Sequence, residues 1–209
     1  SVSSLENWSM RGANPGGSGH VTGSSSVLKG TLIKSYDLGM ATRSSPAVLD
    51  GVIYIGGDFK IIALHEEDGE TLWETPTNGP VHGTPAVAGD KLFLPLQDKR
   101  LLALDLDSGT TRWEFVSNSP FIGSAVVDGG IVYAAAQDGQ VYAVDADSGQ
   151  GIWNLDMGSS VVQPPAVHRG KFVAGSSGGN IFVRNARTGD KRLRIRTGSL
   201  LVQRPVIGD

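Results

Sequence analysis

The chain has 209 residues, of which 39% are hydrophobic and 19% are charged, so it is long enough to form a packed core. Glycine contributes 29 residues, about twice its usual share, which favours many tight turns and an all-β fold. The absence of cysteine excludes disulfides, thiolate metal sites and a cysteine nucleophile within these residues. No apolar run approaches the ~20 residues of a membrane-spanning helix, and we expect the chain to be part of a longer protein.

Charge is divided unevenly along the chain. The formal net charge is −3, yet residues 168–209 carry nine Lys or Arg against two Asp or Glu. This basic end predicts attraction for an acidic partner or a second copy of the chain, with self-association as one result. A basic surface balanced by neighbouring segments of a longer protein is the alternative. Arg192, Arg194 and Arg196 alternate without interleaved aromatic residues, so we expect no nucleic-acid binding.

Residues 1–29 are interpreted as an irregular lead-in. Gly16–Gly19 lacks the strand-to-helix context and the lysine of a phosphate-binding loop, so it reads as a flexible segment. Residues 30–45 are expected to supply the outer strand of a preceding repeat unit. Lys34 then stands at the position where later units have tryptophan.

A period of 40 residues runs through the rest of the chain. Trp73, Trp113 and Trp153 keep this spacing, and so do four glycines: Gly69, Gly109, Gly149 and Gly189. The period divides the chain into four full units, at residues 46–84, 85–124, 125–164 and 165–204, with a further inner strand beginning at 205–209. Strand-rich repeats of about 40 residues are typical of β-propeller blades.

Each unit is expected to form four short antiparallel strands. In the second unit they are predicted at residues 81–88, 91–96, 101–105 and 110–116. The Gly-Asp and Ser-Gly pairs between them supply the positive φ angles of tight turns. The sequence therefore predicts an all-β fold, a β-propeller of about four full four-stranded antiparallel blades plus partial ones.

The repeat Ala-x-Asp-x-x-Ser-Gly-x-x-x-Trp, with Pro-Ala-Val ahead of it in most units, resembles the quinoprotein-type (PQQ-like) β-propeller repeat. The resemblance covers residues 30–209. It implies that each tryptophan docks its blade on the neighbouring blade, a structural role for Trp73, Trp113 and Trp153. It also implies rings of about seven or eight blades, so the four units are expected to form an arc of a larger ring.

Polar residues at the starts of the inner strands are the candidate binding residues, because propellers bind at one end of their central channel. Five such residues depart from the repeat pattern: Arg43, His82, Gln163, Gln203 and Arg204. Three aspartates in hairpin turns of the same end are further candidates: Asp58, Asp98 and Asp138. An aspartate in a tight turn also caps its own hairpin, so turn chemistry is the alternative explanation for these three.

Catalytic chemistry has little support in the sequence. The four histidines have no metal-ligand spacing and lie in different repeats or loops. Dehydrogenases of the family that the chain resembles hold a quinone beneath a disulfide of adjacent cysteines and bind calcium through Glu, Asn and Asp. Because this chain has no cysteine and no glutamate at an inner-strand position, we expect no metal, no cofactor and a role other than catalysis.

Two functions are compatible with these observations. The first is a non-catalytic interaction or scaffold module that binds a protein or peptide partner, similar to envelope propellers or to sensor domains attached to kinases. The second is a fragment of a quinoprotein oxidoreductase, which a cysteine pair and a calcium-binding set elsewhere in the full-length protein would reveal. Repeats of this kind are mostly exported, so a periplasmic or other extracytoplasmic location is expected.

Overall fold

The computed structural model describes residues 35–161, 163–198, 205 and 207. Within them the chain forms four sheets of four antiparallel strands each and no helix. The first blade contains β1 (Ala47–Leu49), β2 (Val52–Gly56), β3 (Lys60–His65) and β4 (Thr71–Pro76). The second contains β5 (Ala86–Ala88), β6 (Lys91–Pro95), β7 (Arg100–Asp105) and β8 (Thr111–Val116). The third contains β9 (Phe121–Asp128), β10 (Ile131–Ala136), β11 (Gln140–Asp145) and β12 (Gly151–Asp156). The fourth contains β13 (Ala166–His168), β14 (Lys171–Gly175), β15 (Asn180–Asn185) and β16 (Lys191–Arg196).

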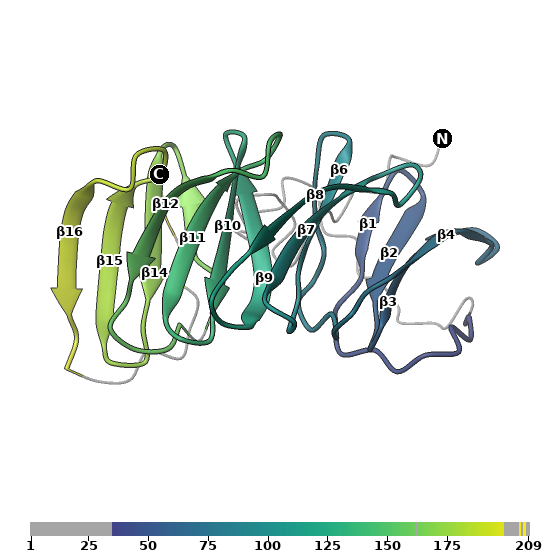
Figure 1. Ribbon diagram of the computed structural model, residues 1–209, viewed down its shortest axis with the longest axis horizontal. Coiled ribbons are helices and arrows are strands. Elements are labelled where there is room, and N and C mark those ends of the chain that lie inside the picture. The colour runs from purple at the N-terminus through teal and green to yellow at the C-terminus, as the bar shows by residue number, and fades with distance from the viewer. Residues whose placement is uncertain (1–34, 162, 199–204, 206, 208–209) are drawn as a thin grey trace, which may run out of the picture.

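Neighbouring strands of each sheet follow one another in the chain, so every blade is an up-and-down meander. Figure 1 shows the blades side by side in chain order, from β1–β4 at one end to β13–β16 at the other. An apolar cluster packs between each pair of consecutive blades. The sheets do not close into a ring, and the all-β, four-stranded antiparallel blade fold is thus confirmed as a partial propeller.

The tryptophans lie between consecutive blades. The indole Nε1 of Trp73 donates a 3.0 Å hydrogen bond to the carbonyl of Leu106 in the next blade. Its ring covers Gly109, where a Cβ would lie 2.4 Å from Trp73 Cε3, and Gly109 has a φ of +69°. Glycine is therefore required in this turn both by the backbone angle and by the ring above it.

Tyr36 covers the corresponding glycine of the first blade. A Cβ on Gly69 would lie 2.2 Å from Tyr36 Cδ1, and the tyrosine hydroxyl donates a hydrogen bond to the carbonyl of Glu66. Lys34, which the repeat aligns with the tryptophans, lies outside the described residues. An aromatic ring thus fills this position in front of the first blade as well.

The inner strand differs between blades. In the second blade it is only Ala86–Ala88, shorter than the predicted residues 81–88, because Pro85 has no N–H to continue the ladder. In the third blade Ser124 replaces the proline, and β9 extends back to Phe121. Its pairing with β10 shifts register beside Gly123, which has a φ of +67°, the geometry of a β-bulge.

Candidate functional site

The segments that lead into the inner strands of all four blades meet at one end of the blades. They surround a hollow of about 190 Å³, which we call the inner-strand hollow. Its lining is mostly polar and consists of Arg43, Ser45, His82, Gly83, Thr84, Gly123, Ser124, Gln163 and Pro164. Residues far apart in the chain, one group from each blade, therefore share one surface.

Hydrogen bonds and close backbone packing hold these segments in place. The buried hydroxyl of Ser44 donates to the carbonyl of Gly56 at 2.9 Å and accepts from its N–H at 3.1 Å. The backbone N–H of Thr84 donates to Ser124 Oγ at 2.9 Å, linking the second blade to the third. Gly83 packs so closely that a Cβ would lie 2.0 Å from the carbonyl oxygen of Gly123. Contacts within the protein itself thus hold the backbone of the hollow.

Three of the five predicted inner-strand residues come together at the hollow. Arg43 and His82 are exposed and Gln163 is half-buried, all three on its lining. Gln203 and Arg204 lie outside the described residues. At the corresponding position of the third blade, Ile122 packs against an apolar cluster, so the polar groups are not distributed evenly around the hollow.

The chemistry of the lining favours hydrogen-bond acceptors on a ligand. Arg43 offers a planar fork of N–H donors, while His82 and Gln163 carry both donors and acceptors. The hydroxyls of Ser45, Thr84 and Ser124 also line the hollow. Such a set suits carboxylates and the peptide groups of an extended chain.

Sequence reasoning missed these three hydroxyl residues. Each lies within a few positions of Arg43 or His82 in the repeat register, and that register was the signal that could have identified them. Serine and threonine are frequent in the turns of this chain, which hid them among turn residues.

The three candidate aspartates do not line the hollow. Asp98 accepts hydrogen bonds from Arg100 Nε at 2.8 Å and Nη2 at 2.6 Å, and also from the Arg100 backbone N–H. Asp138 accepts from the backbone N–H of Gln140 at 3.0 Å. Asp58 lies half-buried in the turn between β2 and β3. The contacts of Asp98 and Asp138 are those of residues that cap a hairpin.

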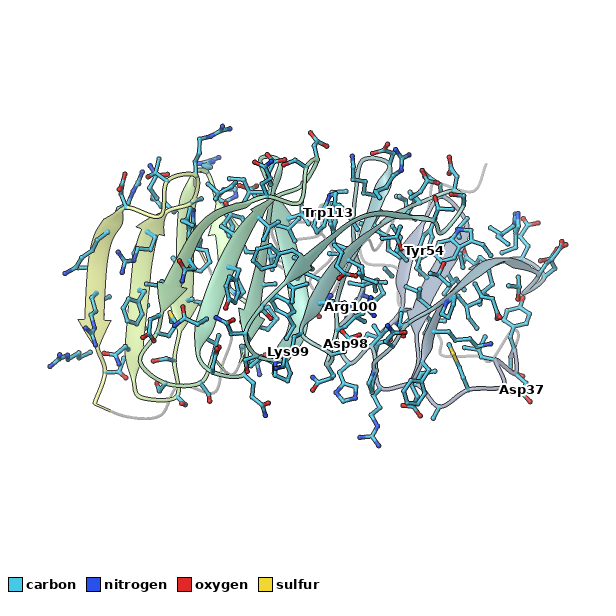
Figure 2. The ribbon with its side chains drawn as sticks, in the orientation of Figure 1. Asp37, Tyr54, Asp98, Lys99, Arg100 and Trp113 are labelled. Carbon is cyan, nitrogen blue, oxygen red and sulfur yellow. The ribbon has the colours of Figure 1, made fainter. Side chains whose placement is uncertain are left out.

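Arg100 belongs to a small ion-pair network and does not line the inner-strand hollow. Besides Asp98, it pairs with Glu114 on the adjacent strand at 2.9 Å. The hydrogen bond that the Arg100 guanidinium donates to Asp98 raises its pKa most, and the one it donates to Glu114 adds to this, partly opposed by desolvation. Figure 2 shows Asp98, Lys99 and Arg100 together at the turn between β6 and β7.

The residues of the hollow do not fit the calcium site that is expected in the dehydrogenases that the repeat resembles. Its lining has no carboxylate, the charged side-chain ligand that Ca²⁺ prefers. Across the described ranges there is no group of three or more His, Asp or Glu side chains arranged to hold a metal ion.

In that same part of the chain no helix has the length and apolar character needed to cross a membrane.

The fourth blade keeps an apolar face without a neighbour among the described residues. Leu193 takes the tryptophan position and is 49% exposed, and Ile195 beside it is 43% exposed. On the other face of β16, Arg194 lies 5.0 Å from the ring centroid of Phe182 and its Nε donates to Asn180. The end of the arc is therefore both apolar and basic.

Solved propellers have the same fold. BamB from Moraxella catarrhalis has a TM-score of 0.68 at 20% identity, over 79% of this chain and 53% of that chain. Quinohemoprotein alcohol dehydrogenase from Comamonas testosteroni has a TM-score of 0.78 at 15% identity, over 95% and 43% of the two chains. A europium-containing methanol dehydrogenase has a TM-score of 0.75 at 15% identity, over 94% and 50%. The chain thus spans about half the length of these proteins, and at these identities the likeness shows the fold alone.

The sequence profile of one family covers most of the chain. No curated protein sequence matches the chain significantly. The profile described as outer membrane protein assembly factor BamB, however, matches residues 17–122 and again residues 96–206. Together the two overlapping matches include residues 17–29 of the lead-in and all four blades. The chain therefore belongs to the family of the outer membrane protein assembly factor BamB.

Proposed function

We propose that this chain is a non-catalytic propeller module that binds an extended segment of a protein partner at the inner-strand hollow. The observation that carries the proposal is the meeting of Arg43, His82 and Gln163, which come from three different blades, on one polar surface. Nothing in the folding of the repeat requires Arg43 or His82, because their register holds Ile122 in the third blade. Residues that are free of a folding constraint at a channel end are available for binding.

The hollow suits a peptide in an extended conformation. Such a segment presents free carbonyl and N–H groups along both edges, which Arg43, Gln163 and the hydroxyls around them can pair. An acidic side chain in the segment would pair with the Arg43 guanidinium. The basic fourth blade adds a long-range attraction for the same kind of partner, so binding is expected to weaken with salt.

Family membership supports a protein partner and a place in the cell envelope. The matching profile is that of an outer membrane protein assembly factor, and one solved structure of similar fold is a BamB. We infer that the chain works as an interaction or scaffold module in the periplasm. Its partner is then a protein handled at the outer membrane.

Selection of peptides on the protein tests this function. A random peptide library displayed on phage is panned on the 209-residue chain, and the selected peptides are measured by fluorescence anisotropy. We expect selected peptides to be rich in Asp or Glu. The double variant Arg43→Ala, His82→Ala is expected to lose at least about tenfold in affinity, because two side chains of the hollow are removed.

A matched variant controls for charge. His65→Ala with Arg187→Ala removes the same two residue types, and both side chains are exposed outside the hollow. This control is expected to bind like the parent chain. Equal losses in the two double variants, or peptides that bind the Arg43→Ala, His82→Ala variant as well as the parent, would contradict the proposal.

A further inference from the structure

A second hollow lies at the opposite end of the blades, between the second and third blades. Its volume is about 370 Å³, against roughly 150 Å³ for a cavity that accommodates benzene. We call it the wedge hollow. It is lined by Ala88, Gly89, Asp90, Lys91, Phe93, Val127, Asp128, Gly129, Gly130, Ala146 and Asp147.

The space between the first and second blades is filled at the corresponding position. There Leu49 and Val52, which pair with each other across the first hairpin, pack with Leu106 against the apolar cluster. Leu106 is also the residue whose carbonyl accepts the hydrogen bond of Trp73. Three branched aliphatic side chains therefore pack in the space between the first and second blades, which we call the first wedge.

In the space between the second and third blades, the second wedge, the same three positions hold smaller or charged residues. Ala88 pairs with Lys91 as Leu49 pairs with Val52, and Ala146 accepts the hydrogen bond of Trp113 as Leu106 accepts that of Trp73. Two leucines are thus replaced by alanine and a valine by lysine. The wedge hollow is the volume that these replacements leave between Phe93 and Val127.

The rim of the wedge hollow carries an excess of negative charge. Lys91 Nζ lies 2.9 Å from Asp90 Oδ1 and 2.9 Å from Asp147 Oδ1. The third carboxylate of the lining is Asp128. Arg112 is not part of the lining. Its Nη2 lies 3.6 Å from Asp90 Oδ2 and also pairs with Asp105. The lining thus includes one ammonium group and three carboxylates.

The two carboxylates around Lys91 are accessible from outside. The side chain of Asp147 is 88% exposed and that of Asp90 is 63% exposed, whereas that of Lys91 is 15% exposed. Exposed ion pairs of this kind contribute little to stability, so they exchange partners at small cost. A cation from outside can therefore share Asp90 and Asp147 with Lys91.

We propose that the wedge hollow receives an arginine side chain of a protein partner. Its aliphatic stem would lie on the apolar floor formed by Phe93 and Val127. Its guanidinium would pair with the carboxylates of the rim, where the fork of N–H donors matches carboxylate geometry. The site is independent of the inner-strand hollow, since it lies at the other end of the blades and prefers the opposite charge.

Titration with an arginine probe tests this proposal. N-acetyl-arginine amide is added to the ¹⁵N-labelled 209-residue chain, and the amide resonances of Gly129 and Gly130 on the lining are followed by NMR. We expect saturable shifts with the arginine probe and at least about tenfold weaker binding of N-acetyl-citrulline amide, which has the same shape without the charge. Equal shifts with the two probes, or saturable shifts only at residues far from the lining, would overturn the proposal.

Two sets of variants separate the floor from the rim. Ala88→Leu with Ala146→Leu restores the leucines of the first wedge, and it should abolish the shifts while the chain stays folded. Asp90→Asn with Asp147→Asn should weaken arginine binding about tenfold without refilling the hollow, so the proposal stays testable if the leucine variant fails to fold. Glu66→Gln with Glu67→Gln, exposed in the first blade, is the matched control and should bind like the parent. Arginine binding that survives both lining variants would show that the wedge hollow is not the site.

Discussion

Trp113 and Ala146 are joined across two blades by a hydrogen bond of 3.0 Å, from the indole Nε1 to the carbonyl oxygen. Trp153 makes the same bond to Ala186 at 2.9 Å. The hydrogen bond of Trp113 anchors one edge of its ring, and the ring also covers Gly149. A Cβ on Gly149 would lie 2.7 Å from Trp113 Cδ2. One residue thus fixes the distance and the angle between neighbouring blades.

Truncation of this ring should separate the blades. Trp113→Ala is expected to lower the free energy of unfolding by about 3–5 kcal/mol, because a large apolar side chain is replaced by a void. Trp113→Phe keeps most of the ring and loses the hydrogen bond, at a cost of about 1 kcal/mol. Urea unfolding followed by circular dichroism measures both. A Trp113→Ala variant within about 0.5 kcal/mol of the parent would refute the docking role.

The glycine under the ring allows a matched comparison. Gly149 and Gly158 both have positive φ angles, +73° and +72°, but only Gly149 has the ring of Trp113 where a Cβ would be. Gly158→Ala should therefore cost only the backbone strain, about 1 kcal/mol, whereas Gly149→Ala should cost clearly more. Thermal melts of the two variants measure the difference. Equal melting temperatures would mean that the ring can move aside freely.

Acid should reduce the stability that Asp105 contributes at the turn between β7 and β8. Arg112 and then Ser108 donate hydrogen bonds that hold the pKa of Asp105 well below its usual range. The folded pKa is thus lower than the unfolded one, so this contribution to stability is present above about pH 4 and is lost as the pH falls toward the lowered pKa. Melting temperatures between about pH 5 and pH 2 should converge for the parent and Asp105→Asn. Arg112→Gln should reduce the same pH dependence, and parallel curves for all three proteins would contradict this assignment.

The open face of the fourth blade should make the isolated chain associate. Leu193→Lys with Ile195→Lys is expected to shift the chain toward monomer in light scattering, since it places charge on this apolar face. Leu72→Lys with Ile152→Lys is the matched control, because these two side chains are similarly exposed, at 45% and 43%, but lie on other blades. The control should associate like the parent. A parent chain that is already a stable 21.9 kDa monomer would contradict the prediction.

The fold could be predicted because the repeat contains the same blade-packing pair three times. Trp73, Trp113 and Trp153, each 36 residues before a glycine of the next turn, encode the packing of one blade on another. The period also placed Arg43 and His82 in one register, which the structure brings to a single hollow. Where the chain repeats, spacing alone carries three-dimensional information.

Features that break the repeat could not be predicted in this way. The bulge at Gly123 depends on a proline that is missing from the third unit, and Tyr36 takes a place that the register assigned to Lys34. The wedge hollow depends on side-chain volumes at three positions in two blades. These three side chains meet only once the blades are packed together, so no local sequence pattern predicts the hollow.

Photo-crosslinking from position 82 is the most direct test of the central claim, that the inner-strand hollow binds a protein partner. A photoreactive amino acid is placed at His82 or, as the control, at His65, an exposed position at the opposite end of the first blade. Both full-length proteins are irradiated in the envelope of the cells that make them. We expect a discrete adduct with a protein from position 82 that disappears with Arg43→Ala, and no such adduct from position 65. The same adduct from both positions, or from position 65 alone, would contradict it.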